Sequence, residues 1–410
     1  MADTTVAFNP FEPGFTDDPY PQYQRMRAGD PVHHSEIGIW VIFGYDDVLH
    51  WLRDSTLSVE QRNAHRTALD DLAEDAIEDY VEQDSLSMLD RDPPDHTRLR
   101  RLVSKAFTPR MIQQLRPRVE EIVDATLADA RERAAGEPWD LIEGLAFPLP
   151  FQVISELLGT PATDTARIRE WSGTLVRGLE PVVDPDVLRA IIDASRSMEG
   201  AIRDIVAWKR THMSDDLMSG LIAVEEDGES LTEQELIDQV ALLYIAGHET
   251  TVNLIGNGTL ALLRHRAQLE RLRADPSLDA NAIEELLRFD SPVQMTRRIT
   301  LAPIEIAGQT IEPGAFVLLG LGSANRDQAH WGDTADELDI GRTGANAHMA
   351  FGGGHHHCLG AALARLEGQV AIGSLARAFP HMELAAEPAW NGRINLRGLR
   401  ELPLALASTG

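Results

Sequence analysis

The stretch Phe351-Gly-Gly-Gly-His-His-His-Cys358-Leu-Gly360 contains the only cysteine of the chain. Three glycines ahead of the thiol allow the backbone to approach a flat ligand closely and to aim its N–H groups at the sulfur. Apolar residues follow Cys358 at helical spacing, at Leu359, Ala362, Leu363 and Leu366. We therefore expect the thiol near the N-terminus of a buried helix, where the helix dipole favours a thiolate.

The residues alone leave three interpretations of this stretch open. A lone thiolate that accepts hydrogen bonds behind a glycine-rich loop suits the proximal ligand of a haem iron. A free, buried cysteine behind a glycine turn is the ordinary alternative for a single thiol. A metal-binding tract of His355, His356 and His357 is the third, although neighbouring residues point in divergent directions and zinc ligands are usually separated by two to four residues.

The chain is strongly acidic, with 37 basic and 65 acidic residues among 410 and a formal net charge of -28. Such a chain is unsuited to sequence-independent binding of phosphate backbones, so we expect no nucleic-acid partner. A single cysteine excludes an intramolecular disulfide and a zinc site built on several thiolates. The apolar stretches are far shorter than the ~20 residues that cross a bilayer, and the N-terminus does not resemble a secretory signal. We therefore expect no membrane insertion and a cytoplasmic location.

No repeat, flexible linker or low-complexity tract divides the chain, so we expect a single domain over residues 1–410. After a short hairpin predicted at residues 31–42, helical spacing dominates. An amphipathic helix with an acidic face is expected at residues 69–81, and a long helix over residues 231–266. Strand-like segments at residues 299–306, 309–311 and 316–320 complete an architecture that is mainly α with a minor β part.

The cysteine stretch resembles the haem-binding loop of the cytochrome P450 family, whose pattern is Phe-Gly-x-Gly-x-His-x-Cys-x-Gly. The matching positions are Phe351, Gly352, Gly354, His356, Cys358 and Gly360. The resemblance implies haem b (iron protoporphyrin IX), with Cys358 as the thiolate ligand of the iron and His356 in contact with a propionate. Phe351, Gly352 and Gly360 would contact the same cofactor. It also implies the P450 fold, a helical prism with a long central helix over the haem and a small β-sheet subdomain.

Two further motifs fit the propionate side of such a cofactor. His96 and Arg100 are four residues apart, so a helix would place both on one face. They resemble the family's His-x-x-x-Arg pair, which implies that they bind propionates. Arg298 resembles the family arginine that bonds a propionate from a strand, and the adjacent Arg297 is the alternative by one position.

Glu285 and Arg288 are three residues apart and would meet on one helix face. The pair resembles the family's Glu-x-x-Arg motif, a buried structural lock near the haem, which implies that both residues maintain the fold and are not catalytic. The third member of this lock usually comes from an Arg-Phe-Asp segment, for which this chain has Glu337-Leu338-Asp339. That departure leaves Arg342 as the candidate third member.

The long helix contains Ala246-Gly-His-Glu-Thr-Thr251, where a continuous helix would favour Ala or Leu. A threonine hydroxyl can bond the carbonyl four residues back, so the helix is expected to bulge and open a small polar groove. The motif resembles the family's acid and alcohol pair, which implies that Glu249 is the acid and Thr250 the alcohol. Together they would relay the protons that cleavage of dioxygen requires.

By the same resemblance, substrate contacts come from residues 62–88, 175–192, 242–246, 293–296 and 393–396. The candidate lining residues are Leu242, Leu243, Ala246, Val293, Met295 and Ile394. Their side chains are apolar, as is typical of small-molecule pockets. We therefore expect an apolar small organic substrate, whose identity these residues do not specify.

The stretch from His96 to Arg118 carries seven basic residues and no acidic one, against the charge of the whole chain. We expect this basic patch to dock an acidic ferredoxin-type electron donor. No flavin or nicotinamide domain follows in the sequence, so electrons are expected from ferredoxin and ferredoxin reductase.

The sequence thus predicts a haem-thiolate monooxygenase that hydroxylates or epoxidises its substrate with dioxygen. A peroxide-driven haem-thiolate peroxygenase is the alternative enzyme, although such proteins tend to lack the pair that Glu249 and Thr250 supply. A non-catalytic haem sensor is the alternative outside the enzymes, and it gives no reason for that pair.

Overall fold

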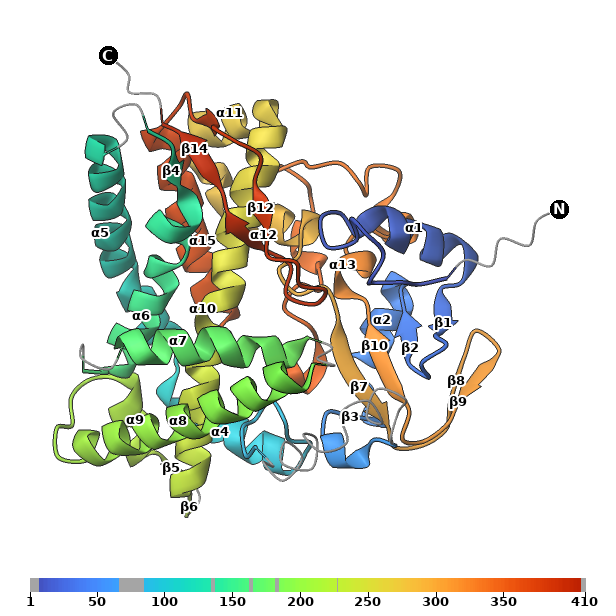
Figure 1. Ribbon diagram of the computed structural model, residues 1–410. Coiled ribbons are helices and arrows are strands. Elements are labelled where there is room, and N and C mark those ends of the chain that lie inside the picture. The colour runs from blue at the N-terminus through green and yellow to red at the C-terminus, as the bar shows by residue number, and fades with distance from the viewer. Residues whose placement is uncertain are drawn as a thin grey trace.

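The structure is a computed structural model that describes residues 7–65, 85–133, 137–161, 165–180, 184–226 and 228–406. Helices form most of it, and the largest sheet lies to one side of them (Figure 1). The predicted class, mainly α with a minor β part, is confirmed. The helix expected at residues 69–81 lies outside the described residues. In the described part of the chain, no helix is both long and apolar enough to cross a membrane.

The helices of the first half are α1 (Tyr20–Gly29), α2 (Tyr45–Trp51), α4 (Asp95–Ala106), α5 (Pro109–Arg133), α6 (Pro148–Leu158), α7 (Thr165–Leu175) and α8 (Pro185–Lys209). Those of the second half are α9 (Leu217–Ala223), α10 (Glu233–Arg264), α11 (Arg266–Ala274), α12 (Asp279–Phe289), α13 (Leu321–Ala324), α14 (Gln328–Trp331) and α15 (Ala361–Ala378). Short turns of other helix types are η1 (Gln61–Asn63), η3 (Ile142–Ala146), η4 (Val176–Leu179), η5 (Pro276–Leu278), η6 (Ala345–Ala347) and η7 (Gly354–His356).

The strands of the first half are β1 (Val32–His34), β2 (Trp40–Ile42), β3 (Leu57–Ser58), β4 (Trp139–Asp140), β5 (Glu225–Glu226) and β6 (Glu229–Ser230). Those of the second half are β7 (Thr296–Thr300), β8 (Ile304–Ile306), β9 (Gln309–Ile311), β10 (Phe316–Leu319), β11 (Glu383–Leu384), β12 (Ala389–Trp390), β13 (Leu399–Glu401) and β14 (Pro403–Ala405).

Helix α10 is the central element around which the other helices pack (Figure 1). It begins with a capping box, in which Thr232 accepts from the Glu235 N–H and the Glu235 carboxylate accepts from the Thr232 N–H. Its 32 residues span about 48 Å at 1.5 Å per residue. Helices α6, α8, α12 and α15 pack against it and share its apolar core. The predicted long helix is confirmed, but the predicted bulge is wrong, because α10 stays α-helical through residues 246–251.

The largest sheet has the strand order β1-β2-β10-β7-β3. Strands β1 and β2 form the predicted antiparallel hairpin, with Val32 opposite Ile42. Strand β10 then runs parallel to β2 and antiparallel to β7, and it carries Val317 and Leu319 into the apolar layer beneath the sheet. Smaller sheets join β11, β14 and β4, and pair β12 with β13. The large sheet thereby places the start of β7 close to the cavity described below.

Candidate functional site

A cavity of about 1290 Å³ lies between α10, α4 and the loop that precedes α15. Its wall includes Cys358, together with Glu249 and Thr250 of α10. The segment η4, the start of β7 and residues 394–396 complete the enclosure. The structure places all of the predicted lining residues on this wall, namely Leu242, Leu243, Ala246, Val293, Met295 and Ile394.

The loop that carries the thiol is shaped by glycines in the left-handed region of backbone space. Gly352 has a φ of 66° and Gly354 a φ of 65°. A Cβ on Gly354 would lie 2.4 Å from the backbone oxygen of Leu52, so no side chain fits there. The loop then closes when the Cys358 N–H donates to the Phe351 carbonyl at 2.9 Å. These constraints direct the thiol into the cavity three residues before α15 begins.

The surroundings of the thiol combine low polarity with donors aimed at the sulfur. Cys358 is exposed to the cavity, yet desolvation by the protein around it raises the pKa of its thiol, and the backbone N–H groups of Gly360 and Ala361 oppose that rise. The guanidinium of Arg100, across the cavity wall, acts in the same direction as these donors. The donors and positive charge would stabilise a thiolate once a metal ion coordinates it.

A second set of contacts supports the loop from behind. Arg365 of α15 lies over the Phe351 ring, 4.5 Å from its centroid, and donates through Nε to Glu284 at 2.6 Å. The ring of His348 contacts the same carboxylate at 3.0 Å. Burial alone would raise the pKa of Glu284, but the bonds from His348 and Arg365 lower it to about 2. The carboxylate is therefore charged at neutral pH and ties α12 to α15 beneath the loop.

Buried polar groups without partners gather on one side of the cavity. Among the described residues, neither ring nitrogen of His96 has a hydrogen-bond partner, nor does Nε2 of His356. The two rings lie 4.3 Å apart, and burial lowers the pKa of His96 to about 4 and that of His356 to about 2. Both rings are therefore neutral and have unused donor capacity.

Arg298 joins these groups on the cavity wall, where Arg297 lies as well. Its side chain is buried, whereas Arg297 is exposed and reaches Asp90 at 3.6 Å. Burial lowers the pKa of Arg298 to about 10, which leaves it charged at neutral pH. The structure therefore favours Arg298 over Arg297 as the inward-facing cation.

This donor set fits a haem. A flat group with two carboxylates would supply acceptors for His96, His356 and Arg298, and its metal would meet the Cys358 thiol. The metal-tract interpretation gains no support, because in the described ranges no three His, Cys, Asp or Glu side chains cluster as ion ligands would. His355 and His356 pack against the ring of His96 instead.

The pair predicted on α10 also lies on the cavity wall. The hydroxyl of Thr250 donates to the carbonyl of Ala246 at 3.2 Å, the i−4 bond expected for a helical threonine. The Glu249 carboxylate accepts a hydrogen bond from Arg393, in the loop after β12. The sequence placed Arg393 only within a substrate-contact segment and did not indicate its bond to Glu249, because nothing local in residues 391–397 points to a helix 144 residues earlier.

The structural lock contains three members. Glu285 and Arg288 are fully buried and form two hydrogen bonds, at 2.7 and 2.8 Å. Arg288 also donates to three backbone carbonyls of the segment between α13 and η6. Arg342 donates through Nε to both oxygens of Glu285, at 3.0 and 3.1 Å, which makes it the third member. The chain thus completes the lock three residues after Asp339.

The basic stretch of residues 96–118 is largely compensated by carboxylates. Arg98 pairs with Glu235, and Arg101 pairs with Glu229 at 2.6 Å. Arg118 contacts Glu156 and Glu121, both at 2.7 Å. The patch that the sequence suggested is therefore less positive than its composition implies.

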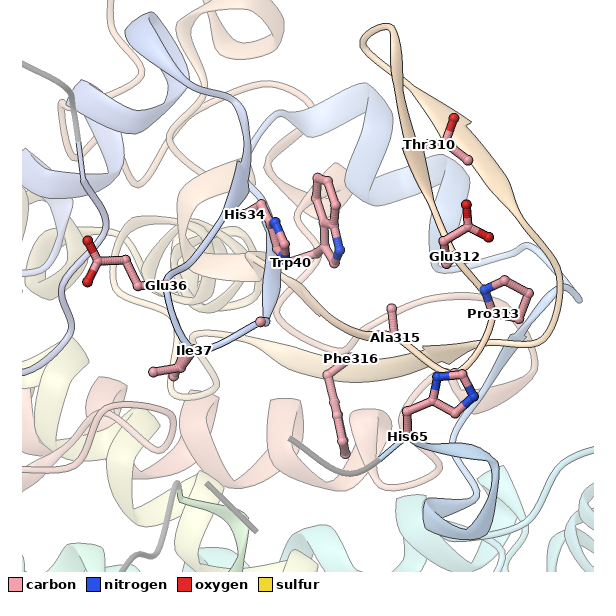
Figure 2. A pocket seen from close by; sticks show the side chains of 12 residues that line it. His34, Glu36, Ile37, Trp40, His65, Thr310, Glu312, Pro313, Ala315 and Phe316 are labelled. Carbon is pink, nitrogen blue, oxygen red and sulfur yellow. The ribbon is translucent and has the colours of Figure 1, made fainter. Parts of the chain in front are cut away.

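A second hollow, of about 530 Å³, lies between the β1–β2 hairpin, His65 and residues 310–316 (Figure 2). His34 stacks on Trp40 there, with ring centroids 4.2 Å apart, and Glu312 and His65 lie across from them (Figure 2). His34 and Ile37 belong to the walls of both hollows. Cys358 and Glu249 line the larger cavity and not the smaller one. The larger cavity is therefore the candidate site.

Comparison with known proteins agrees with this geometry. The family model described as Cytochrome P450 matches residues 188–389. The chain is 43% identical over 404 residues to a vitamin D(3) 25-hydroxylase from Pseudonocardia autotrophica, covering 97% of this chain and 96% of that protein. It is 41% identical to the cytochrome P450 monooxygenase PikC of Streptomyces venezuelae, covering 95% and 91%. The solved structure of PksS, a polyketide synthase cytochrome P450 of Bacillus subtilis, superposes with a TM-score of 0.87 at 37% identity, covering 98% and 100%.

Proposed function

Because the chain belongs to the cytochrome P450 family and is one of its monooxygenases, we propose that it inserts one atom of dioxygen into an apolar small organic substrate, by hydroxylation or epoxidation. The electrons come from ferredoxin and ferredoxin reductase. One observation carries the proposal: the Cys358 thiol and the pair Glu249 and Thr250 lie on the wall of one largely apolar cavity.

The cofactor of this proposal is haem b. Cys358 would bind its iron through the thiolate, and His96, Arg100, Arg298 and His356 would bind its propionates. Thiolate-ligated haem supplies the reductive cleavage of dioxygen, since the thiolate donates electron density that favours breaking the O–O bond. Phe351, Gly352 and Gly360 lie on the same wall and would shape the proximal side.

The protein's own part in the reaction is to deliver protons and exclude bulk water. The Thr250 hydroxyl is already oriented, because its hydrogen is committed to the Ala246 carbonyl and its lone pairs remain available. In a relay, the hydroxyl would turn its hydrogen from the Ala246 carbonyl into the cavity, and Glu249 would replace the proton it gives up by transferring one from solvent through a water molecule. Apolar side chains such as Leu242, Leu243 and Val293 keep the remaining wall dry.

The substrate of the proposal is apolar and of moderate to large size, because the cavity must hold it together with the haem. Two of the similar proteins named above act, by their names, on vitamin D(3) and in polyketide synthesis. We therefore propose a substrate of that general kind.

The first test is the absorption spectrum of the purified holoprotein after reduction and exposure to carbon monoxide. We expect the long-wavelength Soret band of a thiolate-ligated ferrous carbonyl in the wild type and in Thr250→Ala. Cys358→His should lose that band while keeping haem. A wild-type band typical of histidine ligation would refute the cofactor assignment.

Turnover then separates the monooxygenase from its alternatives. We expect product from a panel of apolar substrates with ferredoxin, ferredoxin reductase and dioxygen. Product from hydrogen peroxide alone, with none from the electron-transfer chain, would establish a peroxygenase. A normal carbonyl spectrum with no product from either system would favour a haem sensor.

A further inference from the structure

The loop of residues 391–397, here called the C-terminal loop, is held by one carboxylate from a distant segment. Glu180, directly after η4, accepts hydrogen bonds from three consecutive backbone N–H groups. The distances are 2.8 Å from Ile394, 2.9 Å from Asn395 and 2.8 Å from Leu396. Hydrogen bonds to an ionised acceptor are among the stronger ones in proteins. Glu180 therefore fixes the backbone of the loop and does not merely neutralise a neighbouring charge.

Other contacts make the C-terminal loop stiff. Asn395 donates to the Leu179 carbonyl at 3.0 Å and accepts from the Met295 N–H at 3.0 Å. Within the loop, the Asn391 side chain accepts from the Arg393 N–H at 3.0 Å and donates to the Leu396 carbonyl at 2.9 Å. The loop is thus hydrogen-bonded to η4 through Leu179 and to Met295, the residue before β7. These bonds, with those inside the loop, fix the backbone position of Arg393.

The side chain of Arg393 connects the C-terminal loop to α10. Its guanidinium donates to Oε1 of Glu249, and the two side chains are only 22% and 13% exposed. A charge-assisted pair this well shielded from solvent holds its geometry better than an exposed ion pair. The other oxygen of Glu249 lies 3.8 Å from Nε2 of His248, whose Nδ1 contacts the Tyr244 carbonyl at 2.7 Å. The contact with Arg393 is therefore what orients this carboxylate.

We propose that Arg393 is a positioning residue for the Glu249 carboxylate and that Glu180 sets the position of Arg393. The inference rests on the proposed function, since it assigns the control of the proton relay in the same site. Glu180 and Glu249 are both on the cavity wall, so the segment Val176–Glu180 that encloses the substrate is connected to the acid that supplies protons. The relay acid is then correctly held only when that wall segment is in place.

The first experiment measures hydrogen exchange in the purified holoprotein and does not depend on turnover. Glu180→Gln should speed exchange of the Ile394, Asn395 and Leu396 amides by about tenfold or more, because it removes the charged acceptor. Glu401→Gln is the matched control, since Glu401 is exposed and pairs only with its neighbour Arg400 at 3.2 Å among the contacts of the described chain. Unchanged exchange at the three amides in Glu180→Gln would overturn the role of Glu180.

The second experiment measures the share of electrons that is lost to hydrogen peroxide during turnover. Arg393→Met should raise that share several-fold, Arg393→Lys should restore most of the coupling, and Arg400→Met should leave it unchanged. Glu180→Gln should show the same defect as Arg393→Met, and the double variant should be no worse than either, because both act through one contact.

The outcomes separate this inference from the proposed function. Normal coupling in Arg393→Met, in an enzyme that Thr250→Ala uncouples, would refute the inference and leave the monooxygenase intact. Equal defects in Arg393→Lys and Arg393→Met would also refute it, because a retained charge should position the acid. A wild type that binds haem but forms no product would instead count against the proposed function, and the exchange experiment would still decide the role of Glu180.

Discussion

Thr250 and Thr251 are adjacent in sequence but meet different surroundings in the fold. Successive residues of a helix are about 100° apart around its axis, so two neighbours cannot serve the same face equally. Both residues reach the cavity wall, but Thr251 is only 2% exposed and faces Glu367 of α15, whereas the Thr250 hydroxyl is beside the Ala246 carbonyl. The geometry therefore supports Thr250 as the relay alcohol.

Replacing Thr250 by Ala should uncouple electron consumption from product formation. Without the hydroxyl the proton from Glu249 has no fixed path, and we expect product to fall toward the lower end of the roughly 10²- to 10⁴-fold that positioned proton transfer contributes. Product and peroxide are measured against electrons consumed. Thr250→Ser, which keeps the hydroxyl, should recover most of the coupling. Full coupling in Thr250→Ala would show that the relay is assigned to the wrong residue.

Glu367 is a buried carboxyl that the sequence did not single out. Neither of its oxygens makes a hydrogen bond of good geometry within the described residues. Burial raises its pKa to about 8, and the neighbouring Thr251 opposes the rise only in part. The folded protein therefore keeps this carboxyl protonated at neutral pH, whereas the unfolded chain ionises it above a pH of about 4.3.

The sign of the resulting pH dependence follows from these two pKa values. The folded state binds more protons between them, so the contribution of Glu367 to stability is fully present below about pH 4.3 and is lost as the pH rises through about 8. Glutamine does not ionise, so Glu367→Gln removes this loss. The free energy of unfolding of the variant minus that of the wild type should therefore increase from pH 5 to pH 8. Denaturant unfolding of the holoprotein at both pH values, with the exposed Glu383→Gln as control, measures it. A difference that does not change with pH would contradict the prediction.

At the scale of elements, the cysteine loop depends on how α15, α12 and the segment after α2 meet. Gly352 and Gly354 have nearly the same positive φ, but only Gly354 lies against a neighbouring backbone. A Cβ at Gly354 would lie 2.4 Å from the Leu52 oxygen, whereas a Cβ at Gly352 would have no atom within 4 Å. A side chain at Gly352 would therefore cause backbone strain alone, whereas a side chain at Gly354 would cause both strain and a steric clash.

Gly354→Ala should abolish stable haem incorporation, because strain and clash act together and displace the loop that directs Cys358 into the cavity. Gly352→Ala should retain haem with a moderate loss of stability, of the order of 1 kcal/mol expected for a side chain in the left-handed region. The ratio of haem to protein in the purified variants and their thermal unfolding provide the measurement. Equal haem content in both variants would show that contact with Leu52 does not limit the loop.

At the scale of the whole molecule, charge determines how a redox partner approaches. The chain has a formal net charge of -28, yet α4 and the start of α5 carry the basic stretch that adjoins the cavity through Arg100. Several of its members are paired with carboxylates, including Arg101 with Glu229, so the local field is weaker than the composition suggests. Exposed basic groups beside the thiolate side nevertheless favour an acidic donor over a basic one.

Reversing charge with Arg101→Glu and Lys105→Glu together should slow reduction by an acidic ferredoxin roughly tenfold at low ionic strength, and less as salt is added. The carbonyl spectrum should not change, because both side chains are exposed on α4. Stopped-flow reduction across a salt series is the measurement, with the double variant Arg25→Glu and Arg400→Glu, at two exposed positions outside α4, as the charge-matched control. Equal rates for both variants at every salt concentration would remove α4 from the docking surface.

Local pattern in the sequence was enough to predict the glycine-rich turn around Cys358 and the long helix that is α10, because spacing along one segment specifies turns and helices. The lining residues, such as Leu243 and Met295, followed from the family resemblance, and the structure places them on the cavity wall. The family resemblance supplied the haem and the reaction, and relatives at about 40% identity support that class.

Contacts between distant residues emerge from the tertiary structure. It places Arg393 on Glu249 and Glu180 on the C-terminal loop, and it joins the candidate Arg342 to Glu285, contacts between segments 57 to 216 residues apart. It also buries Arg298 and leaves Arg297 exposed beside Asp90, although both line the cavity. The physical reason is the same in each case: charge and burial act through space, and no local sequence pattern records which partner folding will bring within hydrogen-bond distance.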